Sequence, residues 1–144
     1  MILDDEGRYE EAAAVYLEIT KDCSDGDLAM AYNRISNCMK KLARHEEGLR
    51  YQLLNLALLR SGAVYEVGSE PYVSFLSGEL YFLAETYAKL SNKTEMLAAL
   101  RECISINAQY RSWALAQSAF IPYRDDDDFI EICKSGEGAP GIKK

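Results

Sequence analysis

Apolar residues recur three and four positions apart along almost the whole chain, and this spacing limits the possible folds more than any other feature. Strict alternation of apolar and polar residues, the pattern of a half-buried strand, is almost absent. The chain has 144 residues and only three prolines, so few positions interrupt a helix. The sequence therefore predicts amphipathic α-helices throughout, in one compact all-α domain.

Short breaks and one long connection separate the predicted helices. Breaks are expected at residues 25–27, 43–45 and 91–93, with His45 as a solvated loop residue. The long connection is "SGAVYEVGSEP", in which Ser69 is expected to cap the next helix. The expected helices cover about residues 9–23, 28–42, 46–60, 71–90, 94–106, 110–117 and 126–134. Residues 135–144 are expected to form a disordered tail.

One hairpin, "LYFLAETYAKLSNKTEMLAALRECISINA", resembles a tetratricopeptide repeat. The matching residues are Leu80, Leu83, Ala84, Tyr87, Met96, Leu100 and Cys103. A second copy places Tyr32, Ile35, Ser36 and Met39 on its first helix and Gly48, Gln52 and Asn55 on its second. In a third, N-terminal copy only the second helix is present, with Gly7 at the turn, Tyr9 after it, and Ala12 and Tyr16 on the helix.

Equivalent positions in these copies, Ala12, Gly48 and Met96, are 36 and 48 residues apart. The family period is about 34 residues, so the second interval carries an insertion that fits the long connection. The resemblance implies antiparallel helix hairpins, about six or seven helices in all, stacked as a short right-handed α-α superhelix.

The segment "FIPYRDDDDF" resembles the motif that closes many bacterial tetratricopeptide arrays. The matching residues are Phe120, Pro122, Tyr123, Arg124, Asp125, Asp126 and Phe129. The resemblance implies a repeat domain over residues 1–134 with a C-terminal cap at about residues 109–134. Asp125 is expected to cap the last helix, and the aspartates to stabilise its start rather than bind calcium or magnesium.

The sequence contains no constellation of residues typical of an enzyme. It has no GxSxG, Walker, GxGxxG or HExxH motif, its one histidine has no catalytic neighbours, and its four cysteines lack metal-ligand spacing. We therefore expect no enzymatic activity, no metal and no cofactor.

Charge and hydropathy exclude several kinds of partner. The net charge of −7 disfavours binding to nucleic acid or to an anionic membrane. The N-terminus does not resemble a signal peptide, and no apolar run is long enough to span a membrane. With unpaired cysteines, this predicts a cytoplasmic protein.

In the tetratricopeptide family the first helix of each pair lines a concave groove that holds a peptide. The groove residues expected here are Asn33, Arg34, Asn37, Lys40, Lys41, Tyr81 and Glu85. The first five form an amide-basic patch that resembles part of the family's carboxylate clamp, because amides hold a peptide backbone and cations bind carboxylates. The alternative for this patch is a solvated polar helix face.

These observations favour a non-enzymatic scaffold or adaptor that binds a protein or peptide in the groove. The alternative is a small acidic inhibitor or immunity-type protein that blocks a basic partner. The helix from Tyr9 lacks a hairpin mate, so Val15 and Leu17, with Ile2 and Leu3, are expected to have little cover. An upstream domain, another chain or a second copy in a homodimer is expected to cover them.

Overall fold

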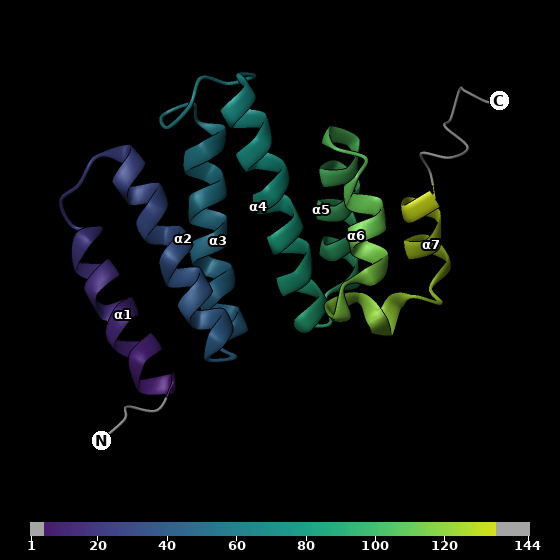
Figure 1. Cartoon of the computed structure of the whole chain (residues 1–144), viewed down its shortest axis with the longest axis horizontal. Helices are drawn as coiled ribbons and strands as arrows, with labels where there is room; N and C mark the ends of the chain where they lie inside the picture. The colour runs from purple at the N-terminus through teal and green to yellow at the C-terminus, as the bar shows by residue number, and fades with distance from the viewer. Residues whose placement is uncertain (1–4, 135–144) are drawn as a thin grey trace. The chain divides into compact units, whose positions relative to one another are not determined.

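The computed structural model describes residues 5–134, which contain seven α-helices, one 3₁₀ helix and no strand (Figure 1). In chain order they are α1 (Asp5–Ile19), α2 (Asp25–Lys41), α3 (His45–Arg60), α4 (Glu70–Lys89), α5 (Lys93–Ile106), α6 (Tyr110–Ala116), η1 (Ser118–Tyr123) and α7 (Asp127–Lys134). The prediction of an all-α chain is confirmed. Ile2, Leu3 and the predicted tail, residues 135–144, lie outside the described residues.

The chain divides into two compact units, with the boundary after Leu76 in the first half of α4. The N-terminal unit contains α1, α2, α3 and the start of α4, and the C-terminal unit contains the rest of α4 and all later helices. The expected boundary of the cap near residue 109 falls inside the C-terminal unit. The superhelix and its handedness stay predictions.

In the N-terminal unit, α2 packs against both α1 and α3. Ala13, Ile35, Cys38 and Met39 form its buried core, and aromatic and aliphatic side chains from all three helices surround it. Small residues such as Ala13 let the helices approach closely, and the larger side chains fill the space between them. At the margin of this core, Arg44 forms an ion pair with Glu10 of α1.

Gly48 lies where α3 closely approaches α2. A Cβ at this glycine would lie 3.3 Å from Met39 Cβ, which is tighter than ordinary van der Waals contact. The buried stripe of α3 continues from Gly48 through Gln52, Asn55 and Leu59. These include the positions that the repeat pattern identified, although two of them are polar.

The three- and four-residue spacing of the sequence also predicts an apolar face of this helix through Leu49, Leu53 and Leu56, and this prediction is wrong at Leu53, which is exposed. Leu49 and Leu56 are only partly buried. Close contact at Gly48 decides which face of α3 meets α2, and leucines off that face gain less burial.

The two complete hairpins end their first helices in the same way. Ala43 and Ser91 both have φ of 60°, the left-handed conformation that commonly ends a helix. The amide of Arg44 donates to Met39 O at 2.8 Å, and the amide of Asn92 donates to Tyr87 O at 2.9 Å. The two turns are therefore equivalent and 48 residues apart, like Gly48 and Met96. The prediction that tight turns divide both hairpins is confirmed.

Three sequence predictions about helix ends are wrong. Gly7 is the third residue of α1 rather than part of a preceding turn. The first N–H groups of a helix have no intrahelical acceptors, so this part of the helix tolerates a glycine. His45 is the first residue of α3 rather than a loop residue. Residues 25–27 begin α2 instead of breaking a helix, because the Ser24 hydroxyl accepts from Asp27 N at 3.2 Å and caps α2.

The first helix also ends earlier than the predicted Cys23, at Ile19. There the Thr20 hydroxyl donates to Leu17 O at 2.6 Å, a local bond that competes with helix continuation. On the same helix, Val15 is 59% exposed and Leu17 is 37% exposed, so the expectation that they have little cover is confirmed. What covers them stays a prediction.

The long connection between α3 and α4 is ordered around two glycines and one aromatic pair. Gly62 and Gly68 have φ of 83° and 89°, conformations that other residues rarely adopt. The rings of Tyr65 and Phe75 stack with centroids 5.3 Å apart. The Ser69 hydroxyl accepts from Tyr72 N at 3.4 Å, so the predicted cap at Ser69 is confirmed.

In the C-terminal unit, α4 and α5 form the second hairpin. The Cys103 thiol of α5 donates to Ser77 O of α4 at 3.3 Å. All seven residues matched to the repeat pattern in this hairpin are buried, and Ala84, Met96, Leu100 and Cys103 are fully so. This burial follows from close packing of antiparallel helices.

In the closing segment, the residues "SAFIPY" form the 3₁₀ helix η1, which contains Pro122, and α7 follows it. Asp126, rather than the predicted Asp125, caps α7, because Asp126 Oδ1 accepts from Phe129 N at 3.1 Å. Lys93 at the start of α5 pairs with Asp126 Oδ2 at 2.5 Å and with Asp128 Oδ2 at 3.3 Å. Asp126 thus caps α7 with one carboxylate oxygen and pairs with Lys93 through the other.

This ion pair predicts a pH-dependent contribution to stability. The hydrogen bond from Lys93, then that from Phe129 N–H, lowers the Asp126 pKa below its ordinary 3.8, and the hydrogen bond to Asp126 raises the Lys93 pKa above 10.5. The contribution of Asp126 to folding stability is therefore complete at pH values above its ordinary pKa. It is lost as the pH falls through the lowered pKa of the folded protein. The Lys93 contribution is lost as pH rises through the raised value.

We expect Lys93→Met to lower the melting temperature at neutral pH, and the difference from the unsubstituted protein to shrink at both pH extremes. Thermal unfolding followed by circular dichroism across pH measures this. Asp126→Asn is the matched control, because it keeps an acceptor for Phe129 N and removes only the charge. A melting-temperature difference that does not change with pH would show that charge pairing contributes nothing.

Candidate functional site

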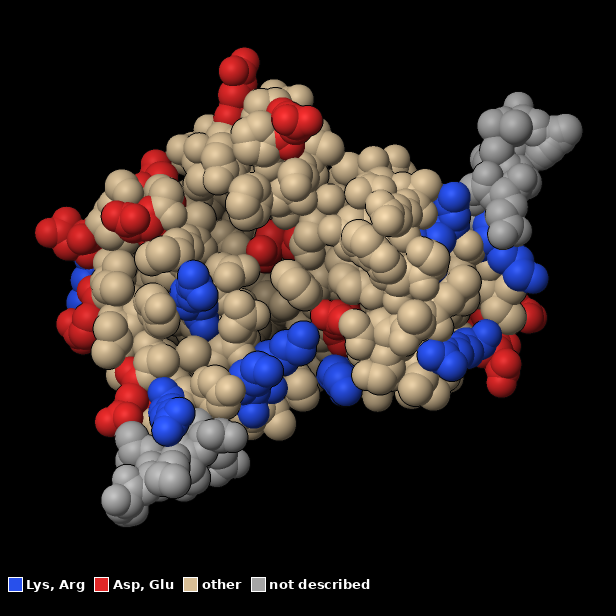
Figure 2. All heavy atoms as spheres, in the orientation of Figure 1, with Lys and Arg blue, Asp and Glu red and all other residues tan. Residues whose placement is uncertain are grey.

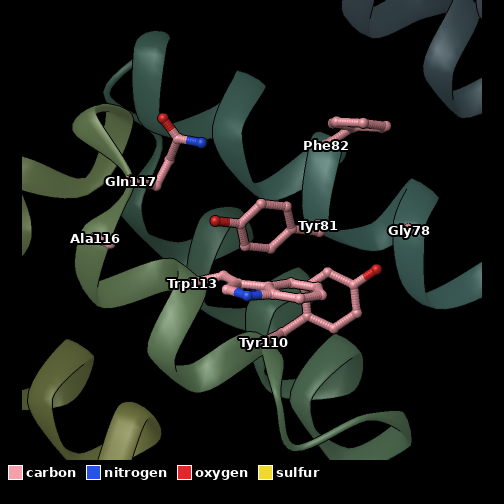
Figure 3. Close-up of a pocket in the computed structure, with 7 residues that line it drawn as sticks. All are labelled: Gly78, Tyr81, Phe82, Tyr110, Trp113, Ala116 and Gln117. Atoms are coloured by element: carbon pink, nitrogen blue, oxygen red, sulfur yellow. The ribbon is translucent and has the colours of Figure 1, made fainter.

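A pocket of about 480 Å³ opens between α4 and α6 in the C-terminal unit (Figure 3). Gly78, Tyr81 and Phe82 of α4 line one side. Tyr110, Trp113 and Ala116 of α6, with Gln117 after it, line the other. Residues three and four apart share one face of a helix, so each helix presents a single stripe to this pocket.

The aromatic rings form a connected group that runs from the core to the surface. Tyr81 lies between Tyr110, at 4.9 Å between ring centroids, and Phe120, at 5.9 Å. Tyr110 meets Trp113 at 4.7 Å, with the ring planes perpendicular. Tyr81 is only 8% exposed, whereas Phe82 is 41% and Trp113 is 45% exposed. The pocket therefore has a fixed aromatic floor and an open rim.

The polar groups at the floor are neutral. Burial, and then the charge of Glu85, raise the pKa of Tyr81 to about 12, although a hydrogen bond with the Gln117 side chain acts in the opposite direction. Figure 3 shows the Tyr81 hydroxyl directed toward Gln117. At neutral pH the phenol is thus protonated and takes part in hydrogen bonding rather than acting as a nucleophile.

The buried cysteines are unsuited to covalent chemistry. All four are free, and Cys38, Cys103 and Cys133 are buried. Burial raises the pKa of Cys103 to about 12 and that of Cys133 to about 11. A thiol with such a pKa carries almost no thiolate at neutral pH, and thiolate is the reactive form.

Within residues 5–134 no group of three or more histidine, cysteine, aspartate or glutamate side chains could hold a metal ion. The aspartate run is instead used at the start of α7, where Asp126 caps the helix and Asp126 and Asp128 pair with Lys93. No helix in this part of the chain is long and apolar enough to cross a membrane.

The amide-basic patch predicted from the sequence lies on α2 in the N-terminal unit. Asn37 Nδ2 donates to Asn33 Oδ1 at 3.3 Å, so the two amides pair with each other along the helix. Arg34, Lys40 and Lys41 are exposed, and Lys40 and Lys41 stand in the last turn. Figure 2 shows basic side chains gathered over this end of α2.

The other two predicted groove residues, Tyr81 and Glu85, lie on α4 in the C-terminal unit. The 48-residue offset between the hairpins makes Tyr81 equivalent to Asn33, and Glu85 equivalent to Asn37. Unlike Asn37, Glu85 is buried, at 6% exposure, and Tyr81 is packed against Tyr110 and Phe120. In this unit the Tyr81 ring packs against Tyr110 of α6 and Phe120 of η1, and a groove role for Tyr81 and Glu85 stays a prediction.

Sequence reasoning did not identify Gly78, Tyr110, Trp113 or Gln117 as site residues. A signal was present, because Tyr110, Trp113 and Gln117 are spaced three and seven apart on one helix face. The family pattern assigns groove residues to the first helix of each pair. Because α6 lies in the predicted cap, the pattern assigns no groove residue to it.

No protein-family model matches the chain, and no curated protein and no solved structure matches it. The pocket is therefore interpreted from its own geometry and chemistry.

The open rim predicts how Trp113, the single tryptophan, responds to a quencher. With the indole 45% exposed, we expect emission typical of a partly solvated indole and efficient quenching by acrylamide. Stern–Volmer analysis of the folded protein, compared with the protein unfolded in urea, measures the accessibility. A blue-shifted emission that resists acrylamide would contradict an open pocket.

Proposed function

We propose that this chain is a non-enzymatic scaffold or adaptor that binds a peptide or protein partner, and that the α4/α6 pocket anchors one partner side chain. The observation that carries the proposal is Trp113, exposed at the rim of a floor made by Tyr81 and Tyr110. Tryptophan and tyrosine dominate binding energy at protein interfaces because they bury large, rigid surfaces. The volume of about 480 Å³ lies in the range of ligand pockets.

Three features support a binding role over catalysis. The buried thiols have raised pKa values, and the described residues lack a metal-holding group. The pocket lining contains neither a carboxylate nor a histidine that would act as general acid or base.

The setting that we propose is a reducing cytoplasm, where the four free cysteines would persist. The net charge of −7 supports a protein partner rather than nucleic acid or an anionic membrane.

The amide-basic patch on α2 is the second contact surface in this proposal. Asn33 and Asn37 offer amides for a peptide backbone, and Lys40 and Lys41 offer cations for a carboxylate. A tetratricopeptide-like arrangement of the hairpins would present such a surface in a groove. The 48-residue equivalence of the two turns supports that arrangement.

A second candidate is the acidic inhibitor or immunity-type protein. Glu11, Glu18, Asp22, Asp25 and Asp27 are exposed on α1, the link after it and the start of α2 (Figure 2). A basic partner bound there would depend steeply on salt, because exposed charges are screened. Its binding would not depend on Trp113.

The test is selection of a displayed library of random peptides on the purified protein, followed by calorimetry with synthesised peptides. We expect Trp113→Ala to weaken binding by about 10-fold or more, as truncation of an aromatic anchor does. Leu115→Ala is the matched control, because Leu115 is equally exposed on the same helix but does not line the pocket.

Asn33→Ala combined with Asn37→Ala tests the second surface, and should weaken peptides that also contact α2 without lowering the melting temperature. Failure to select any peptide, or equal binding by the Trp113→Ala and Leu115→Ala variants, would overturn the proposed anchor. Binding that responds to salt but not to Trp113→Ala would favour the acidic inhibitor.

A further inference from the structure

We propose that the α4/α6 pocket takes a proline-rich segment of the partner, with proline rings packed on its aromatic lining and a carbonyl group accepting from the Tyr110 hydroxyl. This inference rests on the proposed function and names the chemistry of the segment that is bound. Three observations carry it: the lining is aromatic and uncharged, its polar groups suit carbonyl acceptors, and one wall has no side chain beside the Tyr110 hydroxyl.

The lining of the pocket is aromatic and carries no charge. Four of its seven residues are aromatic, two are small, and the last is Gln117. A charged side chain that entered would lose water and meet no opposite charge in this lining, which is unfavourable. An apolar side chain would exchange water for contact with the rings, which is favourable. The lining therefore selects an uncharged, apolar occupant.

The polar groups of the lining suit carbonyl acceptors better than N–H donors. The indole N–H of Trp113 can only donate, and the Tyr110 hydroxyl can donate. The side-chain oxygen of Gln117, Oε1, already accepts from the Ser118 hydroxyl at 3.3 Å. A partner N–H group buried here without an acceptor would weaken binding. Proline has a carbonyl group and no N–H, so it brings only the group that this lining can satisfy.

The α4 wall of the pocket has no side chain at Gly78, in the interior of this 20-residue helix. Outside the backbone of its own helix, a Cβ there would meet only the Tyr110 hydroxyl among the described residues, at 3.8 Å. Figure 3 shows this hydroxyl on the side of Gly78. Glycine weakens a helix interior, and close packing does not require it here. The vacant space therefore lets a partner backbone approach α4 and reach the Tyr110 hydroxyl.

The rings suit an extended segment rather than a single enclosed side chain. Phe82 of α4 and Trp113 of α6 are 41% and 45% exposed, so the pocket is open along its rim. Tyr110 and Trp113 have perpendicular ring planes, and they present ring surfaces in two orientations. A polyproline II segment makes no internal hydrogen bonds, so it offers proline rings and free carbonyl groups together. Because it is already ordered, its binding costs little conformational entropy.

The experiment uses blocked heptapeptides in which three identical residues stand between glycine pairs. The three residues are proline, N-methylalanine, alanine or leucine. N-methylalanine lacks the ring and the N–H, alanine lacks the ring and keeps the N–H, and leucine adds apolar surface while keeping the N–H. The indole N–H resonance of Trp113, the single tryptophan, reports binding to the full chain in a ¹H–¹⁵N spectrum.

We expect the proline peptide to shift this resonance saturably and to bind about 5-fold or more tightly than the alanine and leucine peptides, because their N–H groups lack acceptors in the pocket. The N-methylalanine peptide should bind with an affinity between those of the proline and alanine peptides, since it lacks only the ring contacts.

The Tyr110 hydroxyl is tested in the same assay. Tyr110→Phe keeps the ring and removes the hydroxyl, and should weaken the proline peptide by about 3- to 10-fold. Tyr123→Phe is the matched control, because Tyr123 of η1 does not line the pocket, and it should leave the affinity unchanged. Gly78→Leu should abolish binding by filling the space beside the hydroxyl. If Gly78→Leu fails to fold, Tyr110→Phe decides the question alone.

The outcomes separate this inference from the proposed function. Equal affinity for the proline and leucine peptides, or no shift with the proline peptide, overturns the proline-rich segment. Selected library peptides that lack proline but depend on Trp113 would also overturn it, while leaving the pocket as an anchor site. Unchanged binding of the proline peptide to the Tyr110→Phe variant overturns the role of the hydroxyl.

Discussion

The packing of Phe120 holds the C-terminal unit together. Its ring is fully buried, with centroids 5.9 Å from Tyr81 of α4 and 5.7 Å from Phe129 of α7. The helices α6 and α7 have only seven and eight residues, and helices of this length are not stable in water without tertiary contacts. Their positions therefore depend on the aromatic residues between them and α4, and the pocket depends on the position of α6.

This dependence explains how a site open to solvent can still have fixed geometry. Tyr81 packs against the buried ring of Phe120 and against Tyr110. Trp113 packs against Tyr110 and extends this group of rings to the surface. A partner side chain would meet rings that are already ordered, so binding would cost little further conformational entropy. Next to Phe129, at the start of α7, Lys93 pairs with Asp126 and Asp128.

The sequence was sufficient for the helices because their periodicity is a local property. The repeat pattern predicts the turns at Ala43 and Ser91, but it also places a turn at Gly7, which lies within α1. Residues 25–27 are predicted as a break because the sequence does not show that Ser24 caps α2 there. The sequence predicts Asp125 as the N-cap of the last helix, because a run of aspartates does not show which carboxylate accepts from a helix N–H and pairs with a lysine of another helix. Gln52 is polar, and the sequence does not show that the stripe from Gly48 through Gln52 is buried while Leu53 is exposed.

The pocket could be predicted only in part. The sequence predicts Tyr81 as a groove residue, but it does not show that the Tyr81 ring packs against Tyr110 of α6 and Phe120 of η1. The vacant space beside Gly78 is visible only in three dimensions, since a glycine within a helix carries no sign of whether its missing side chain serves close packing or a cavity.

Hydrogen–deuterium exchange of a Phe120→Leu variant tests most directly whether this aromatic packing supports the pocket. Replacing a fully buried ring by a smaller side chain leaves unfilled space and removes the ring contacts with Tyr81 and Phe129. The account predicts faster exchange in α6 and α7 together, with unchanged exchange in α2 and α3. If α6 keeps its protection while α7 alone loses it, the pocket does not depend on this cluster, and the central claim is contradicted.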